Sequence, residues 1–166
     1  VTACITHFER PESLQRLLGS IKKFYPDLKI LVEETHGNLS AARNRLYARC
    51  ETPYVLMLEE DFVFTEETDI EKLVKVLETN DWLGGVGGCT REPKVAGTAG
   101  RGGKIWWDRD FKRIRNQCYL AGAKRGWREL DGIKYRQCDI VINFGVFRKE
   151  VFEEVTWDED LPVQEH

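Results

Sequence analysis

Residues 54–61, Tyr-Val-Leu-Met-Leu-Glu-Glu-Asp, contain the most strongly apolar run of the chain, and this run ends abruptly in three carboxylates. The apolar part predicts a buried strand near 53–58. An acidic triplet directly after such a strand is held at a fixed place on the edge of a sheet. We call Glu59, Glu60 and Asp61 the acidic triplet.

Strand-like and helix-like segments alternate on both sides of this run. Apolar periodicity predicts further strands near 1–8, 28–33, 83–89 and 140–147. It predicts helices at 12–25, from Leu39 to Cys50, from about Asp69, and around Val151–Val155. Short connections between alternating strands and helices favour right-handed βαβ units. The expected fold class is therefore α/β, with a Rossmann-like, mainly parallel sheet flanked by helices.

Length and charge narrow the class of protein. A chain of 166 residues is long enough for one compact domain, and its net charge of −3 makes a nucleic-acid partner unexpected. No apolar run approaches the roughly 20 residues that cross a bilayer, and the start lacks the pattern of a signal peptide. The chain begins and ends abruptly, so we expect a piece of a longer protein that is truncated at its C-terminus.

The five cysteines lie far apart, without a Cys-x-x-Cys pair. This spacing does not favour a zinc site or a redox motif. The cysteines are interpreted as small buried residues, with one disulfide as the alternative in an oxidising compartment. Sequence alone does not pair them.

Polar clusters follow three of the predicted strands, at residues 6–10, 33–34 and 59–61. Open α/β sheets bind ligands at the carboxyl ends of their strands. Three adjacent carboxylates repel one another unless a cation is present, and hard divalent ions prefer oxygen ligands. The acidic triplet therefore predicts a metal site, and a solvated acidic turn is the competing interpretation.

Two further features each leave alternatives open. Arg43, on the second predicted helix, is suited to pair with a phosphate or with a strand-end carboxylate, and a plain surface arginine is the alternative. Trp106, Trp107 and Trp127 lie among polar and basic residues, where they fit either core packing or the binding of a sugar ring.

Several common active-site motifs are absent from the sequence. Gly103-Lys104 lacks the first glycine and the final Ser or Thr of a P-loop, and no Gly-x-Gly-x-x-Gly follows the first strand. His7, His36 and His166 have no spacing typical of a metal trio, and no Gly-x-Ser-x-Gly accompanies them. Nucleophilic hydrolysis and ordinary dinucleotide binding are therefore disfavoured.

Taken together, three segments resemble a known family. Residues 5–32 (ITHFERPESLQRLLGSIKKFYPDLKILV) and 38–73 (NLSAARNRLYARCETPYVLMLEEDFVFTEETDIEKL) resemble the N-terminal half of a GT-A-fold glycosyltransferase, and 139–166 resemble its acceptor-side segment. The similarity is to the β-1,4 N-acetylgalactosaminyltransferases, which include ganglioside-synthesising enzymes. It implies a single domain at 1–166, with a nucleotide half at about 1–90 and an acceptor-side half at about 91–166.

The resemblance implies roles for the strand-end residues. Phe8, Glu9 and Arg10 would line the nucleotide site, Glu33 or Glu34 would face the uracil or ribose, and Arg43 would hold the base or diphosphate. The acidic triplet occupies the position that binds Mn²⁺ or Mg²⁺ and the ribose-diphosphate, with Asp61 and Glu59 as metal ligands and Glu60 toward the nucleotide. The family pattern there is three aspartates, whereas this chain has Glu-Glu-Asp.

The resemblance also implies an activity: inverting, cation-dependent transfer of a hexose or N-acetylhexosamine, with GalNAc expected, from a UDP-sugar to a hydroxyl of a glycan or glycolipid. Glu165 is the candidate catalytic base. Because the chain stops at His166 within the motif that carries the base, we expect the 166 residues to transfer sugar poorly. A eukaryotic parent would lie in the Golgi lumen, on a membrane anchor outside this chain, and self-association is expected.

Three other interpretations compete with this one. An inactive relative that binds nucleotide fits the Glu-Glu-Asp triplet, and a nucleotidyltransferase also places carboxylates and Mg²⁺ at strand ends. The latter would need a glycine-rich signature and a lysine near the first strand, which residues 6–11 lack. A plain α/β interaction domain is the last alternative.

Overall fold

The computed structural model describes residues 1–88, 127–135 and 143–160. The chain divides into two compact units, one formed by Val1–Gly88 with Ile142–His166 and the other by Cys89–Val141. Each unit is described by itself below. Several residues considered in the sequence lie outside the described residues: Cys89, Gly103, Lys104, Trp106, Trp107, Cys118, Cys138, Glu165 and His166. The division into halves at about residue 90 stays a prediction.

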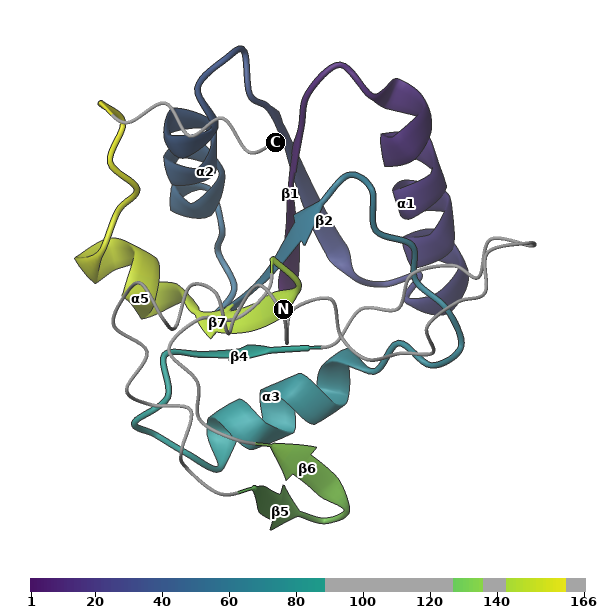
Figure 1. Ribbon diagram of the computed structural model, residues 1–166, viewed down its shortest axis with the longest axis vertical. Helices are drawn as coiled ribbons and strands as arrows, with labels where there is room; N and C mark the ends of the chain where they lie inside the picture. The colour runs from purple at the N-terminus through teal and green to yellow at the C-terminus, as the bar shows by residue number, and fades with distance from the viewer. Residues whose placement is uncertain (89–126, 136–142, 161–166) are drawn as a thin grey trace, which may run out of the picture. The chain divides into compact units, whose positions relative to one another are not determined.

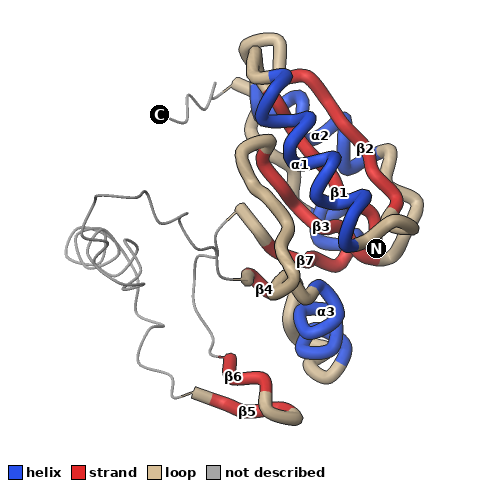
Figure 2. The backbone as a smooth tube through the Cα atoms, turned by 90° about the vertical axis from the view of Figure 1, so that its right-hand side faces the viewer, coloured by secondary structure: helices blue, strands red, loops and turns tan. Residues whose placement is uncertain are grey.

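The first unit is built on a five-stranded sheet with the strand order β2-β1-β3-β7-β4 (Figures 1 and 2). The strands are β1 (Thr2–His7), β2 (Lys29–Glu34), β3 (Tyr54–Glu59), β4 (Gly85–Gly87) and β7 (Gly145–Arg148). β1 is parallel to both of its neighbours, whereas β7 runs antiparallel to β3 and to β4. A mainly parallel sheet flanked by helices is therefore confirmed, and the reversed direction of β7 was not predicted.

Within the described residues, four helices accompany the sheet: α1 (Pro11–Phe24), α2 (Leu39–Ala48), α3 (Ile70–Glu78) and α5 (Lys149–Glu154). Each of the first three begins at a residue that suits a helix start. Pro11 occupies the first turn of α1, where its fixed φ is already helical. The side chains of Asn38 and Asp69 cap α2 and α3 by accepting hydrogen bonds from the N–H groups of Ala41 and Lys72.

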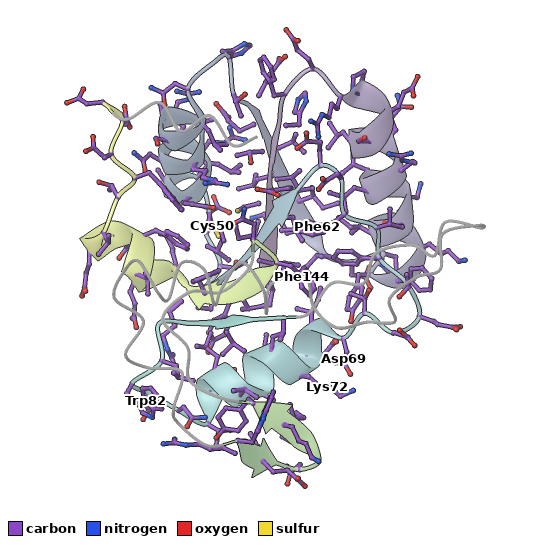
Figure 3. All side chains as sticks on the ribbon, viewed as in Figure 1. Cys50, Phe62, Asp69, Lys72, Trp82 and Phe144 are labelled. Atoms are coloured by element: carbon purple, nitrogen blue, oxygen red, sulfur yellow. The ribbon has the colours of Figure 1, made fainter. Side chains whose placement is uncertain are left out.

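Helices cover both faces of the sheet, so the central strand is buried on both sides. Leu56 and Leu58 of β3 pack into a core with α1 and α3, while Val55 and Met57 pack into a second core with α2 and α5. Figure 1 shows α1 and α2 on opposite sides of β1. This double burial explains why the run at 54–58 is continuously apolar rather than alternating. In the first core, Phe62 and Phe144 lie with ring centroids 6.0 Å apart (Figure 3).

The glycine-rich strand β4 approaches β7 closely. A side chain at Gly85 would collide with the ring of Phe147, which lies directly opposite in β7. Glycine is therefore required where the aromatic ring crosses the neighbouring backbone. β4 is shorter than the strand predicted at 83–89.

The described part of the second unit is a hairpin of β5 (Arg128–Leu130) and β6 (Ile133–Tyr135). Its turn, Asp131-Gly132, has positive φ at both residues, 48° and 80°. Asp-Gly is typical of such two-residue turns, so this dipeptide indicates the hairpin, which the sequence analysis did not predict. In the part of the chain that the structure describes, no helix has the length and apolarity needed to cross a membrane.

Candidate functional site

The carboxyl ends of β1, β2 and β3 meet at one edge of the sheet, which we call the carboxyl edge. In the strand register, Thr6 of β1 lies between Glu33 of β2 and Glu59 of β3, and His7 lies beside Glu34. All three polar clusters predicted from the sequence therefore gather at this edge. An ion pair joins the first cluster to the third, with Arg10 Nη1 3.7 Å from Glu60 Oε1.

The members of the acidic triplet have different surroundings. Glu59 Oε1 accepts a hydrogen bond of 2.6 Å from Asn143 Nδ2 and lies 3.4 Å from Arg43 Nη2. Glu60 is partly buried beside Arg10, and Asp61 is exposed where the strand has ended. Glu59 is the last residue of β3, whereas Glu60 and Asp61 lie in the turn that follows it. Glu60 is therefore paired with the loop after β1, while Glu59 is engaged by Arg43 of α2 and by Asn143.

Arg43 is buried, with only 2% of its side chain exposed. Its guanidinium lies between the Glu59 carboxylate and the ring of Trp157, whose centroid is 4.6 Å from Cζ. A buried cation needs both a counter-charge and a surface that tolerates it, and a carboxylate with an aromatic face supplies both. Of the alternatives left open by the sequence, pairing with a strand-end carboxylate is the one observed.

The two glutamates that end β2 are also separated by strand alternation. Glu33 binds both Arg45 Nε, at 2.8 Å, and Arg49 Nη1, at 2.5 Å, on the outer side of α2. The hydrogen bond from Arg45 lowers the pKa of the Glu33 carboxyl, and the charges of the two arginines act in the same direction. Glu34 lies on the other face, with its carboxylate largely exposed and 3.8 Å from His36 Nε2.

The loop after β1 is exposed and strained. Glu9 has φ 51°, in the left-handed region that non-glycine residues rarely adopt, and Phe8 is half exposed. Within the described residues, the Nδ1 atom of His7 is buried without a hydrogen-bond partner. Backbone strain and unmet hydrogen-bonding groups are concentrated at functional sites. Phe8, Glu9 and Arg10 therefore stand where a ligand of the carboxyl edge would meet them.

The carboxylates of this edge fit a divalent cation that is shared with a phosphate group. Among the described residues, no three His, Cys, Asp or Glu side chains are grouped closely enough to hold an ion by themselves. Mg²⁺ is commonly bound by one or two protein carboxylates together with substrate phosphates. Asp61 and Glu60 provide hard oxygen ligands of this kind, whereas Glu59 is already engaged by Arg43 and Asn143.

Two side chains of this site were missed by sequence reasoning. Asn143 and Trp157 both contact the Arg43–Glu59 pair, although they follow it by about 100 positions in the chain. A polar residue interrupting the apolar run at 140–147 was the available signal for Asn143. Trp127 is exposed in the hairpin of the second unit, and the two described cysteines, Cys4 and Cys50, are buried free thiols.

An open, mainly parallel sheet with acidic and basic side chains at the ends of three neighbouring strands is typical of α/β proteins that bind a ligand at the carboxyl edge. Residues 9–155 match the family model described as glycosyl transferase family 2, and the chain belongs to this family. The GT-A-like fold is thereby confirmed.

Similar proteins agree with this assignment. The chain is 28% identical over 180 residues to mouse β-1,4 N-acetylgalactosaminyltransferase 2, an alignment that covers 95% of the chain and 33% of that protein. It is 34% identical over 111 residues to rat β-1,4 N-acetylgalactosaminyltransferase 1, covering 55% of the chain and 21% of the relative. The human counterpart is 32% identical over the same share. The chain thus spans a third or less of the length of these relatives, and the resemblance seen in the sequence is confirmed.

Proposed function

We propose that this chain forms the donor-binding part of a glycosyltransferase that moves a hexose or N-acetylhexosamine, specifically GalNAc, from a UDP-sugar to a hydroxyl group of a glycan or glycolipid. The observation that carries the proposal is the convergence of Arg10, Glu34, Glu60 and Asp61 at one edge of the sheet. Membership of glycosyl transferase family 2 and the names of the relatives support it.

The donor would lie along the ends of β1 and β2. Phe8 offers an exposed ring for the uracil, and Glu9 and Arg10 line the same loop. Glu34 is the better candidate for the ribose hydroxyls, because Glu33 is already bound by two arginines of α2. Arg43 acts on this region through Glu59 rather than by reaching the diphosphate itself.

The acidic triplet is the proposed place for the cation. When bound, Mn²⁺ or Mg²⁺ supplies positive charge beside the UDP leaving group. Asp61 is the proposed main ligand and Glu60 the second, while Glu59 keeps Arg43 and Asn143 in place. Arg10 forms an ion pair with Glu60.

A carboxylate is needed to accept the proton of the acceptor hydroxyl as that oxygen attacks the anomeric carbon. General base catalysis of this kind contributes about 10²–10⁴-fold to rate. Glu165 remains the candidate base, and its position lies outside the described residues. Direct attack by the acceptor would invert the anomeric centre. If the parent protein is eukaryotic, we propose the Golgi lumen as its location, as the resemblance to the β-1,4 N-acetylgalactosaminyltransferases implies.

A second candidate function is nucleotide binding without transfer. The structure offers one observation in its favour, since Glu59 is engaged inside the protein and leaves two carboxylates of the triplet for a cation. Such a relative would bind UDP and Mn²⁺ yet release no sugar. The two functions therefore differ in turnover and not in donor affinity.

Calorimetric titration of UDP, with and without Mn²⁺, tests the donor site. We expect Mn²⁺ to strengthen UDP binding by at least about tenfold, and Asp61→Asn to remove that gain because it deletes the main ligand charge. Asp27→Asn is the matched control, since Asp27 is an exposed aspartate that precedes β2. Unchanged Mn²⁺-dependent binding in Asp61→Asn would refute the assignment. Assay of UDP-sugars with a panel of acceptors then separates the transferase from the inactive relative.

A further inference from the structure

The segment Trp157–Asp160, which follows α5, is attached to α2 by an unusual set of hydrogen bonds. We call it the α2-bound segment. Asn44 Nδ2 donates to the carbonyl oxygen of Trp157 at 2.9 Å and to Glu159 Oε1 at 2.8 Å. The N–H of Trp157 in turn donates to Asn44 Oδ1 at 2.9 Å. One side chain thus binds both backbone groups of Trp157, as a neighbouring strand would.

Asn44 uses both of its donor hydrogens in these contacts, because an amide nitrogen has two. A second attachment comes from Asn38, whose Nδ2 donates to the carbonyl oxygen of Glu159 at 3.1 Å while its Oδ1 caps α2. The α2-bound segment is therefore fixed at two points, by the N-cap residue Asn38 and by Asn44 in the middle of α2. Neither asparagine is needed there for apolar packing.

The attachment also reaches the carboxyl edge. With its backbone fixed by Asn44, Trp157 lies over the Arg43 guanidinium, and Arg43 in turn pairs with Glu59 of the acidic triplet. Arg43 and Asn44 are adjacent in α2, so one helical turn holds the strand-end carboxylate on one side and the α2-bound segment on the other. The segment consequently borders the proposed donor site on its α2 side.

We propose that Asn44 is a positioning residue for the acceptor step: it fixes the α2-bound segment as the wall that an incoming acceptor meets beside the donor. This inference rests on the proposed function. Asn44 touches no reacting atom in this account and acts through Trp157 and Glu159. Its loss should therefore impair use of the acceptor while leaving UDP binding intact.

Exchanging the amide and the carboxylate of the Asn44–Glu159 hydrogen bond tests the inference. Asn44→Asp is nearly isosteric, but it loses both donors and places a carboxylate against Glu159. We expect kcat/KM for the acceptor to fall about tenfold or more, with the Kd for UDP changed by less than about twofold. Adding Glu159→Gln returns an amide donor to the contact, now from the other side, so the double variant should recover part of the loss, although the Trp157 carbonyl oxygen stays without its donor. Glu159→Gln alone should be mild, because the oxygen of the new amide can still accept the hydrogen bond from Asn44.

The matched control is Asn80→Asp at the end of α3. Asn80 Nδ2 donates to the carbonyl oxygen of Val76 at 2.8 Å, so this variant also deletes a buried amide donor, in a different part of the same unit. Equal effects of Asn44→Asp and Asn80→Asp on acceptor kinetics would overturn the inference. A parallel loss of UDP affinity in Asn44→Asp, or no recovery in the double variant, would overturn it as well.

Amide hydrogen exchange tests the attachment without reference to activity. In Asn44→Ala, the N–H of Trp157 loses its acceptor, so exchange across residues 156–160 should rise at least about tenfold while β1 and β3 keep their protection. Unchanged exchange would overturn the inference. If the parent protein turns over no acceptor, the proposed function and the positioning role both fail, and faster exchange would still report the attachment itself. The two failures are thus distinguishable.

Discussion

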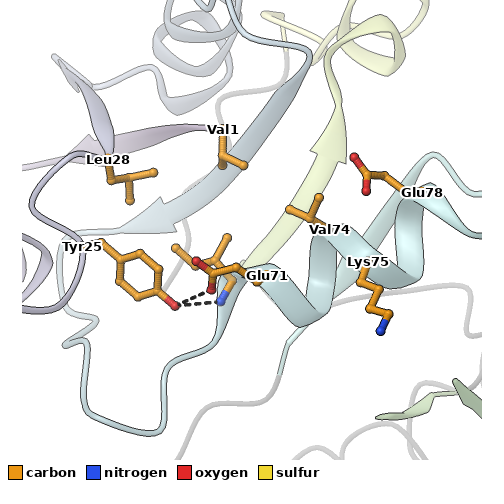
Figure 4. A pocket seen from close by; sticks show the side chains of 8 residues that line it. Val1, Tyr25, Leu28, Glu71, Val74, Lys75 and Glu78 are labelled. Carbon is orange, nitrogen blue, oxygen red and sulfur yellow. Dashed lines mark hydrogen bonds between the residues drawn. The ribbon is translucent and has the colours of Figure 1, made fainter. Parts of the chain in front are cut away.

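The two edges of the same sheet differ in what holds them together. At the carboxyl edge, charged side chains from β1, β2, β3 and α2 form ion pairs, and the loop after β1 is strained. The opposite edge, where β1 and β2 begin, is called the amino edge. Here Val1, Leu28 and Val74 line an open pocket of about 500 Å³, with Glu71, Lys75 and Glu78 of α3 at its margin (Figure 4). Tyr25 closes one side of this pocket by hydrogen bonds between α1 and α3.

The contrast separates stability from function within one fold. At the amino edge, apolar contacts and the hydrogen bonds of Tyr25 connect the end of α1 to the start of α3, which is typical of a contact that serves stability. The carboxyl edge buries an arginine and exposes carboxylates, a costly arrangement that folding alone does not require. Substitutions at the amino edge should therefore change the free energy of unfolding alone, whereas substitutions at the carboxyl edge should also change ligand binding.

The largest effect is expected from Arg43→Met at the carboxyl edge. Removing the buried guanidinium leaves the Glu59 carboxylate partly buried without its counter-charge, so the free energy of unfolding should fall by about 3–5 kcal/mol. Urea unfolding of the variant and the parent measures this difference. Adding Glu59→Gln removes the uncompensated charge and should recover part of the loss. A fall below about 0.5 kcal/mol would mean that the pair is not coupled as described.

A smaller effect, confined to stability, is expected from Tyr25→Phe at the amino edge. The Tyr25 hydroxyl bonds to Thr68 and Glu71 and accepts from the N–H of Ile70. Its loss should cost about 1–2 kcal/mol in the free energy of unfolding, because the Ile70 amide is left without its partner. UDP affinity should not change, and calorimetry on the folded variant checks this. Weakened UDP binding would contradict the division between the edges.

The smallest effect concerns Glu33 and depends on pH. Arg45 and Arg49 lower the pKa of Glu33 in the folded protein, so its contribution is present above the unfolded value of about 4.3 and is lost as pH falls through the folded value. The free energy of unfolding should therefore be about 0.5–1 kcal/mol lower for Glu33→Gln at pH 7. The difference should shrink below pH 4. A difference that grows in acid would reverse the assignment.

The sequence predicted the carboxyl edge better than its internal contacts. Strand positions and the place of the acidic triplet follow from local periodicity, and both Asp69 and Asn38 are recognisable caps. The partners of Glu59 were not predictable, because Asn143 and Trp157 come from chain segments that only the folded sheet brings to Arg43. The direction of β7 was missed for the same reason, since its long connection from β4 leaves either direction open.

Sequence reasoning was also unable to tell which of Glu33 and Glu34 faces α2. Both residues end β2, and a shift of one position reverses the face to which a side chain points. Only the register with β1 and the positions of Arg45 and Arg49 show that Glu33 faces α2. The sequence therefore placed both glutamates at the carboxyl edge, and the folded sheet shows which of the two is bound by the arginines of α2.

Paramagnetic broadening by Mn²⁺ in the presence of UDP tests most directly the claim that the carboxyl edge is the donor site. NMR spectra of the labelled chain with UDP and Mn²⁺ would be compared with spectra containing UDP and diamagnetic Mg²⁺. We expect the amide signals of residues 8–10, 34–36 and 60–61 to broaden, while those of residues 26–28 and 71–78 at the amino edge stay sharp. Broadening at the amino edge, or none at residues 60–61, would contradict the account.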